Sequence, residues 1–338
     1  MLELPQRKWN TGSLYAEFRA MRIKHPLHDA AVGTFEDLRL RKVYAPDEEQ
    51  TTASMFAGSQ SGKTTTVRWY IENQIVDECF RRGIFDEKDR DTPRHILAKV
   101  QTLALYVKLK SSTTMSKLVA SFLVALGDPY PMKGTIGERL LRVDKALREK
   151  GYEIIFIDES QHIRINQSAG PISRQDDATD VQNTFKDILT STWPIVFVGL
   201  PAAKKIVFEE QLDTRSENPI FFGPLSAGDD EHMETFQKFC GRLSMKLVQH
   251  AILPNRAEIL VTGDVPLCLH VASAGRLGLV TVIVRKALEI AFKGKRDEIE
   301  RKDLQEAVRL FSMRIKLCDY NPFIEGVREV PVVQEKAA

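Results

Sequence analysis

The chain has 338 residues, of which 43% are hydrophobic and 28% charged, with a formal net charge of +2, a composition that excludes a disordered chain. No run of about 18 apolar residues exists and the opening MLELPQRKWN lacks an apolar core, so neither a membrane span nor a signal peptide is expected. The four cysteines are scattered without a C-x-x-C pair, which favours reduced thiols in a cytosol over disulfides or a zinc site.

The first hundred residues contain one strand–loop–helix pattern. Residues 1–50 hold helical pieces and end in a polar link, and a short apolar run near 52–57 predicts a strand. The small-residue loop AGSQSGKT, residues 57–64, comes next. Apolar residues then recur at helical spacing, at Val67, Tyr70, Ile71 and Ile75.

Strands and helices alternate through the middle of the chain. Alternating leucines and a valine over 103–109 predict a strand, and residues 111–129 and 135–151 predict two helices. YEIIFIDES (152–160), PIVFVGLP (194–201) and NPIFFGPLS (218–226) predict three more strands, with a helix over 178–192. From Asp229 to about 318 the pattern is helical. The expected fold class is α/β: a parallel sheet sandwiched by helices, followed by a smaller α-helical lid.

The loop at residues 57–64 has the chemistry of a phosphate-binding loop. The usual pattern is G-x-x-x-x-G-K-[ST], but Ala57 stands at the first glycine and the glycine follows at Gly58. Lys63 is expected to bridge the β- and γ-phosphates, and the Thr64 hydroxyl to bind Mg²⁺. The residues predicted to hold ATP are Gly58, Ser59, Gln60, Ser61, Gly62, Lys63, Thr64 and Thr65. The alternative is a small-residue turn before a helix.

The strand IIFIDES ends in two adjacent acids, Asp158 and Glu159. Carboxylates at the end of a buried strand are costly unless they have a cation or a task. Asp158 is therefore expected to hold Mg²⁺ through water, and Glu159 to orient and polarise the attacking water. The alternative is a strand-ending turn, which the loop 95 residues upstream makes less attractive.

Two arginines complete the predicted nucleotide site. Arg215 precedes a predicted strand and could neutralise the γ-phosphate of a neighbouring subunit in the transition state. Arg276, at a predicted helix start in the lid, could reach the nucleotide. Either could instead be an ordinary surface arginine.

In this order, the motifs resemble the AAA+ ATPases, and more narrowly the TniB/TnsC transposition regulators, which are relatives of MuB. The likeness covers roughly residues 20 to 325 and includes RIKHPLHDAA, FLVALGDP, IDESQHI, PIVFVGLPAA and YNPF. Leu200 departs from the family, which commonly has a threonine there, so a polar sensor is in doubt and hydrolysis is expected to be slow and switch-like.

The resemblance implies an ATP- and Mg²⁺-dependent ATPase in the bacterial cytosol, associated with the nucleoid and not with a membrane. Such a protein oligomerises on double-stranded DNA as a ring or filament, recruits a transposase with or without a target-selector protein, and disassembles on hydrolysis. Residues 94–150 carry 11 basic and 4 acidic side chains, a net of +7, where relatives place DNA-facing elements. The DNA-contact candidates are Lys108, Lys110, Ser111, Thr113, Thr114 and Lys117, unless these lysines only confer solubility.

Four segments are predicted. They are an N-terminal helical extension (1–50), an AAA+ nucleotide-binding core (51–226), a helical lid (227–320) and a tail (321–338). Two other functions stay open: a helicase loader or initiator-type ATPase with the same fold, and a nucleotide-binding adaptor with little hydrolysis.

Overall fold

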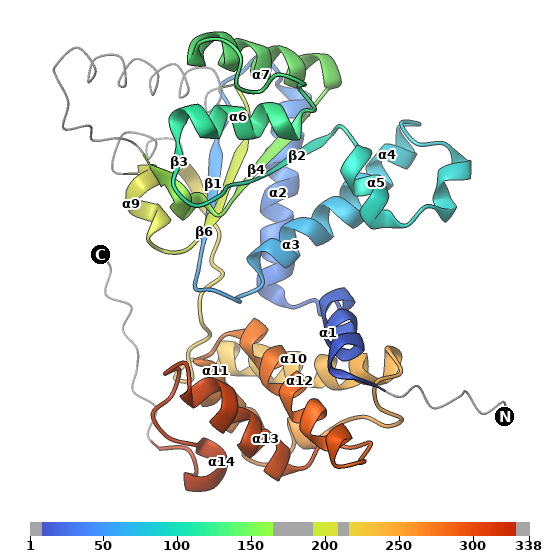
Figure 1. Ribbon diagram of the computed structural model, residues 1–338, viewed down its shortest axis with the longest axis vertical. Helices are drawn as coiled ribbons and strands as arrows, with labels where there is room; N and C mark the ends of the chain where they lie inside the picture. The colour runs from blue at the N-terminus through green and yellow to red at the C-terminus, as the bar shows by residue number, and fades with distance from the viewer. Residues whose placement is uncertain (1–8, 165–191, 209–215, 329–338) are drawn as a thin grey trace. The chain divides into compact units, whose positions relative to one another are not determined.

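The computed structural model describes residues 9–164, 192–208 and 216–328, which form two compact units (Figure 1). Unit 2 consists of residues 27–59 and 63–222, and unit 1 combines the chain up to Pro26, residues 60–62, and the chain from Gly223 onward. The predicted division into four consecutive segments stays a prediction. The predicted helix at 178–192 lies almost entirely outside the described residues.

Unit 2 is built on a parallel sheet in the order β2-β4-β6-β1-β7. Its strands are β1 (Thr52–Phe56), β2 (Ala104–Lys108), β4 (Ile154–Asp158), β6 (Ile195–Gly199) and β7 (Ser216–Pro219). A short parallel pair, β3 (Thr113–Thr114) and β5 (Ile163–Arg164), lies beside it. Its helices are α2 (Pro26–Tyr44), α3 (Lys63–Tyr70), α4 (Val76–Arg81), α5 (Arg94–Val100), α6 (Met115–Ala125), α7 (Ile136–Lys150) and α9 (Ala203–Phe208).

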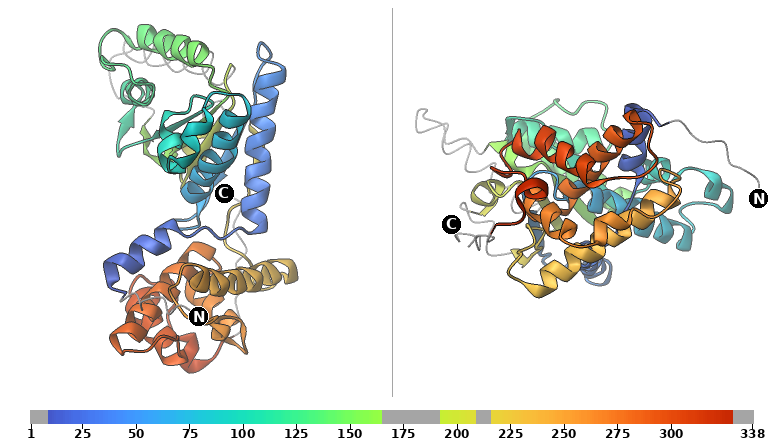
Figure 2. Two further views of the ribbon diagram at one scale, coloured as in Figure 1. Left: turned by 90° about the vertical axis from the view of Figure 1, so that its right-hand side faces the viewer. Right: turned by 90° about the horizontal axis from the view of Figure 1, so that it is seen from below.

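Both faces of the sheet are covered, as the continuous apolar strands predict. In β4, Ile155 and Ile157 pack into a core with α6 and α7 on one face. Ile154 and Phe156 pack on the other face with α2 and α3, where Phe35 of α2 meets the ring of Phe156 at 5.0 Å. Figure 2 shows α2 lying along this second face beside α3 and α4.

The last predicted strand is shorter than expected. β7 covers Ser216–Pro219 and not the apolar run IFF that follows it. Ile220 still donates its N–H to the carbonyl of Ser54 (2.8 Å). The side chains of Ile220 and Phe222 both pack in the core on the face of the sheet that α2 and α3 cover. Pro219 has no N–H to extend the ladder, which confines it to an edge strand.

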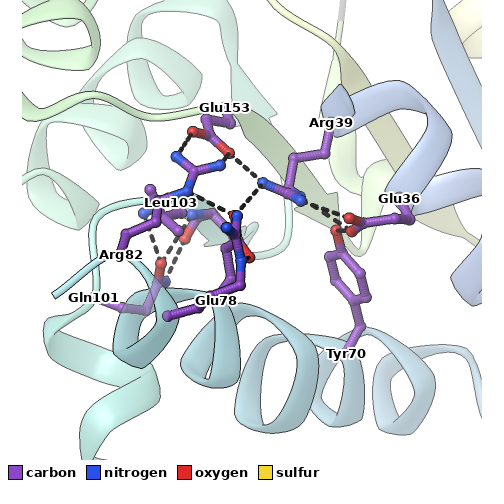
Figure 3. Close-up of polar contacts among 10 residues, drawn as sticks. Glu36, Arg39, Tyr70, Glu78, Arg82, Gln101, Leu103 and Glu153 are labelled. Carbon is purple, nitrogen blue, oxygen red and sulfur yellow. Dashed lines mark hydrogen bonds and ion pairs between the residues drawn. The ribbon is translucent and has the colours of Figure 1, made fainter. Parts of the chain in front are cut away.

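A buried ionic cluster joins α2, α3, α4 and the start of β4 (Figure 3). Arg39 of α2 contacts Glu153 (2.5 Å), which directly precedes β4, and Glu36 (2.5 Å). Glu36 accepts a hydrogen bond from the hydroxyl of Tyr70, the last residue of α3 (2.8 Å). Glu78 of α4 lies 3.7 Å from Arg39. Helix α3 and strand β4, which carry the predicted nucleotide motifs, are thus linked at the ends opposite those motifs.

Unit 1 is helical and contains segments from both parts of the chain. Its helices are α1 (Thr11–Ala20), α10 (Asp230–Gln249), α11 (Val265–Ser273), α12 (Leu277–Lys293), α13 (Arg301–Val308) and α14 (Pro322–Glu325). Glu17 of α1 pairs with His250 (2.7 Å), and Arg285 of α12 lies over the ring of Tyr15 (5.3 Å). Helix α1 therefore belongs to this C-terminal helical unit.

Among the described helices, none alone combines the length and apolar character needed to cross a bilayer, although α11 and α12, bent by 112° to each other, pass that test as a pair.

Candidate functional site

The loop between β1 and α3 has the backbone that its sequence requires. Gln60 and Gly62 have φ of 60° and 107°, whereas Ala57 does not have a positive φ. Alanine therefore fits where the usual pattern has glycine, since only a positive φ would penalise its Cβ. The N–H of Ala57 donates to the carbonyl of Gly199 at the end of β6 (3.1 Å), which joins the loop to the sheet.

Lys63 begins α3 and turns its side chain back over the loop. Its Nζ donates to the carbonyls of Ala57 (2.6 Å) and Gly58 (2.8 Å), and the residue is only 8% exposed. A buried ammonium needs such acceptors because its desolvation is costly. The loop carbonyls thus hold a positive charge at the amino end of a helix.

Asp158 lies at the carboxyl end of β4 and is 2% exposed. Its Oδ2 accepts hydrogen bonds from the hydroxyls of Thr64 (2.8 Å) and Tyr106 of β2 (2.6 Å), and its Oδ1 accepts from the N–H of Glu159 (2.8 Å). Burial, followed by the charge of Asp158, raises the pKa of Tyr106, so this phenol stays a neutral donor. The two predicted Mg²⁺ ligands, Thr64 and Asp158, are therefore in direct contact.

Glu159 follows with a left-handed backbone, φ 63° and ψ 38°. Such a conformation is unusual for a residue with a side chain, and it frequently marks a functional position. The carboxylate accepts a hydrogen bond from Nε2 of Gln161 (2.5 Å), whose Oε1 accepts from the N–H of Leu200 (3.0 Å). The family resemblance leads one to expect a polar side chain at position 200. Leu200 has none, and it contacts Gln161 through its backbone N–H instead.

The remaining predicted nucleotide residues have varied environments. In the loop, Ser59 and Gln60 are exposed and Ser61 is buried. Arg276 precedes α12 and is half-buried, so its role stays a prediction. Arg215 lies outside the described residues.

The DNA-contact candidates extend from the last residue of β2 to the first turn of α6. Lys108, Lys110, Ser111 and Lys117 are exposed. The hydroxyl of Thr113, a buried residue, donates to the carbonyl of Lys110 (2.5 Å), and Thr114 caps α6. The two threonines therefore shape the segment, and any contact they make with DNA stays a prediction.

Two residues of the site, Tyr106 and Gln161, were not predicted. Tyr106 is the polar exception in a strand whose buried leucines gave the pattern, and Gln161 stands two residues after Glu159. A tyrosine in a strand and a glutamine in a turn are common in any protein, so only the fold reveals that they touch the two acids.

Residues 47–207 match the family model of the AAA domain. Three archaeal structures share the architecture. The Aeropyrum pernix ORC1 protein, solved in complex with DNA, is 16% identical, with a TM-score of 0.55 over 85% of this chain and 66% of that one. The fold is that of the AAA+ ATPases.

The other two structures have this fold at similarly low sequence identity. The Aeropyrum pernix ORC2 protein, solved with ADPNP and ADP, is 12% identical, with a TM-score of 0.53 over 87% of this chain and 70% of that one. Cdc6p of Pyrobaculum aerophilum is 15% identical, with a TM-score of 0.54 over 86% and 69%. The chain thus spans about two thirds of the length of these proteins. No curated protein matches it in sequence.

Proposed function

We propose that this chain is an ATPase. Its ATP-bound form assembles on duplex DNA as a homo-oligomer, and hydrolysis of the bound ATP causes the assembly to come apart. The contact between Thr64 and Asp158, 2.8 Å apart beneath the loop that holds Lys63, carries the proposal. It joins a hydroxyl from the phosphate-loop helix to a buried carboxylate from another strand, which a small-residue turn does not require.

The donor set at this point fits Mg²⁺, because a hydroxyl and a carboxylate are the hard oxygen ligands that this ion prefers. When bound, Mg²⁺ would neutralise charge on the phosphate oxygens. Lys63 would bind the β- and γ-phosphates of ATP, and Glu159 would orient the attacking water and accept its proton. Arg215 of a neighbouring subunit and Arg276 are proposed to contact the nucleotide as well.

DNA binding is supported by exposed cations on the elements around the sheet's carboxyl edge. Lys110 and Lys117 are exposed, and β5 pairs with β3 so that the exposed Arg164 is in register with Thr114. The lysine and arginine side chains would neutralise phosphates without reading sequence, so we expect affinity to fall steeply with salt. The ORC1 structure named above, solved with DNA, adds support by likeness of fold.

Two partner systems are proposed for this ATP-dependent assembly on DNA, a transposase and a replicative helicase. The motifs IDESQHI and PIVFVGLPAA favour a transposase, recruited to target DNA with or without a target-selector protein, as in the TniB/TnsC regulators. The likeness of fold to ORC and Cdc6 proteins favours an initiator or helicase-loader role. Stimulation of a transposase by DNA that the ATP-bound chain covers would decide for the first, and loading of a helicase would decide for the second.

Replacing Lys63 with alanine is expected to weaken ATP binding about 10- to 100-fold, because a hydrogen bond to a charged group contributes about 1.5–3 kcal/mol. Electron microscopy with duplex DNA should show ATP-dependent rings or filaments for the wild-type chain and none for Lys63→Ala at the same nucleotide concentration. Lys145→Ala, which removes an exposed lysine (72% side-chain exposure) of the same unit, is the control. Identical particles with and without ATP would refute the DNA-assembly proposal.

Replacing Tyr106 with phenylalanine is expected to raise the Mg²⁺ concentration for half-maximal ATP turnover about 10-fold. The reason is that Asp158 loses one of the donors that orient its Oδ2, and such outer partners commonly contribute this much to metal affinity. A Mg²⁺ titration of turnover measures the effect. Tyr152→Phe, which removes a hydroxyl from another largely buried tyrosine of unit 2, should leave the titration unchanged. Equal titrations for all three proteins would show that Tyr106 does not position Asp158.

A further inference from the structure

The side-chain amide of Gln161 connects the ends of two neighbouring strands. Gln161 lies in the turn between β4 and β5, where its Nε2 donates to the carboxylate of Glu159 (2.5 Å). Its Oε1 accepts from the N–H of Leu200, the residue that follows β6 (3.0 Å). A displacement of the end of β6 therefore reaches the carboxylate of Glu159 through a single side chain.

The surrounding backbone makes room for this amide. A Cβ added to Gly199, the last residue of β6, would lie 2.7 Å from Oε1 of Gln161 and 3.2 Å from the N–H nitrogen of Ser160. Both distances are shorter than ordinary carbon contacts, so a side chain here would push the amide away. Glycine at position 199 thus permits the approach of Gln161 to Leu200.

The turn fixes the backbone of Glu159 separately from its side chain. The hydroxyl of Ser160 donates to the carbonyl of Ile157 (2.8 Å), and the N–H of His162 donates to the carbonyl of Glu159 (2.9 Å). These bonds hold the turn, whereas the bond from Gln161 orients the carboxylate group itself. Glutamine suits this task because its neutral amide donates to the carboxylate without adding a charge beside it, whereas a second carboxylate would repel the first.

We propose that Gln161 is a positioning residue for Glu159, and that the N–H of Leu200 in turn holds the amide of Gln161 in place. The proposal rests on the proposed ATP hydrolysis. It connects the end of β6 to the carboxylate that would activate water. The connection uses the backbone N–H of Leu200, because the leucine side chain cannot form a hydrogen bond.

Steady-state ATP turnover and nucleotide binding of the full chain test this role. Gln161→Ala is expected to lower kcat about 10- to 100-fold, the loss typical of a misplaced catalytic group, with the Kd for ATP changed less than about twofold. Gln161→Glu keeps an acceptor for Leu200 but offers no donor to Glu159, so its kcat should fall at least as far. Gly199→Ala should give a smaller loss, since it displaces the amide without removing it.

Two further variants separate positioning from a merely structural role. Gln50→Ala removes a different, buried side-chain amide of unit 2, one that donates to the carbonyls of Ala45 (2.9 Å) and Glu48 (2.8 Å), and should leave kcat within about twofold of wild type. In a Glu159→Gln background, adding Gln161→Ala should cause no further loss in single-turnover assays, because Gln161 acts only through the group already removed.

Equal kcat for Gln161→Ala and the wild-type chain would overturn the proposal, as would an equal loss in Gln50→Ala or a full additional loss in the double variant. A wild-type chain that binds ATP without turning it over would overturn the proposed hydrolysis itself, together with this role. Measurement of wild-type turnover in the same series distinguishes the two failures.

Discussion

ATP hydrolysis is expected to fall about 10²- to 10⁴-fold when Glu159 is replaced by glutamine, while ATP binding stays near the wild-type value. This range is the usual contribution of a positioned general base. The glutamine keeps an oxygen that can accept from Gln161, and Lys63 and Asp158 are untouched. The variant therefore loses the base without losing the phosphate-binding loop, and its assemblies on DNA should last longer than those of the wild type.

Phosphate release under saturating ATP measures the rate, and a fluorescent nucleotide measures binding. Glu149→Gln, at a side chain of α7 that is 64% exposed, provides a control of identical chemistry in the same unit. A Glu159→Gln protein that hydrolyses ATP at the wild-type rate would exclude Glu159 as the base, and the search would move to another group near the end of β4.

Replacing Arg39 with alanine is expected to destabilise unit 2 by about 3–5 kcal/mol, the usual cost of leaving buried charges without their partner. The Arg39 side chain is 4% exposed and contacts Glu36, Glu153 and Glu78 (Figure 3). Its removal takes away the cation that joins the three carboxylates, of which Glu78 and Glu153 keep Arg82 as a partner. Urea unfolding followed by tryptophan fluorescence suits the measurement, since Trp69 and Trp193 both lie in unit 2.

Arg81 offers a matched control for Arg39. It pairs with the same Glu78, but its side chain is 70% exposed. We expect Arg81→Ala to lower the urea midpoint less than Arg39→Ala does, because the Arg81 side chain is mostly in water and Glu78 keeps Arg39 and Arg82. Equal midpoints for Arg39→Ala and Arg81→Ala would show that the cluster does not stabilise the fold.

The same cluster predicts a pH dependence. Hydrogen bonds from Arg81 and then Arg82 hold the pKa of Glu78 at about 2, below its ordinary value of 4.5. Burial raises the pKa of Glu36, but hydrogen bonds from Arg39 and Tyr70 outweigh it, so this pKa is lowered too. Groups with a depressed folded pKa contribute stability above their unfolded pKa and lose it on acidification. Stability should therefore decrease as pH falls from about 5 towards 2, and less so in Arg39→Ala.

The sequence predicted those parts of the site whose signals are local. A loop before a helix and an apolar run ending in acids predict that Lys63, Thr64 and Asp158 lie together, because parallel strands bring such ends to one edge of a sheet, and their roles with a nucleotide stay a prediction. Tyr106 and Gln161 escaped prediction because their roles depend on contacts between strands. Arg39 escaped for the same reason, since its partner Glu153 lies 114 positions away in sequence.

The composition of unit 1 sets an order for folding during synthesis. Helix α1 ends at Ala20, but its partner α12 begins at Leu277. At roughly 5–20 residues per second, the ribosome needs about 10 to 50 s to make the intervening chain. During that time the side chain of Leu14 in α1, which is 1% exposed in the complete fold, is not yet buried by the rest of unit 1. Unit 2 ends at Phe222, so we expect the nascent chain to pass through a stage in which the sheet of unit 2 can form while unit 1 has only its first helix.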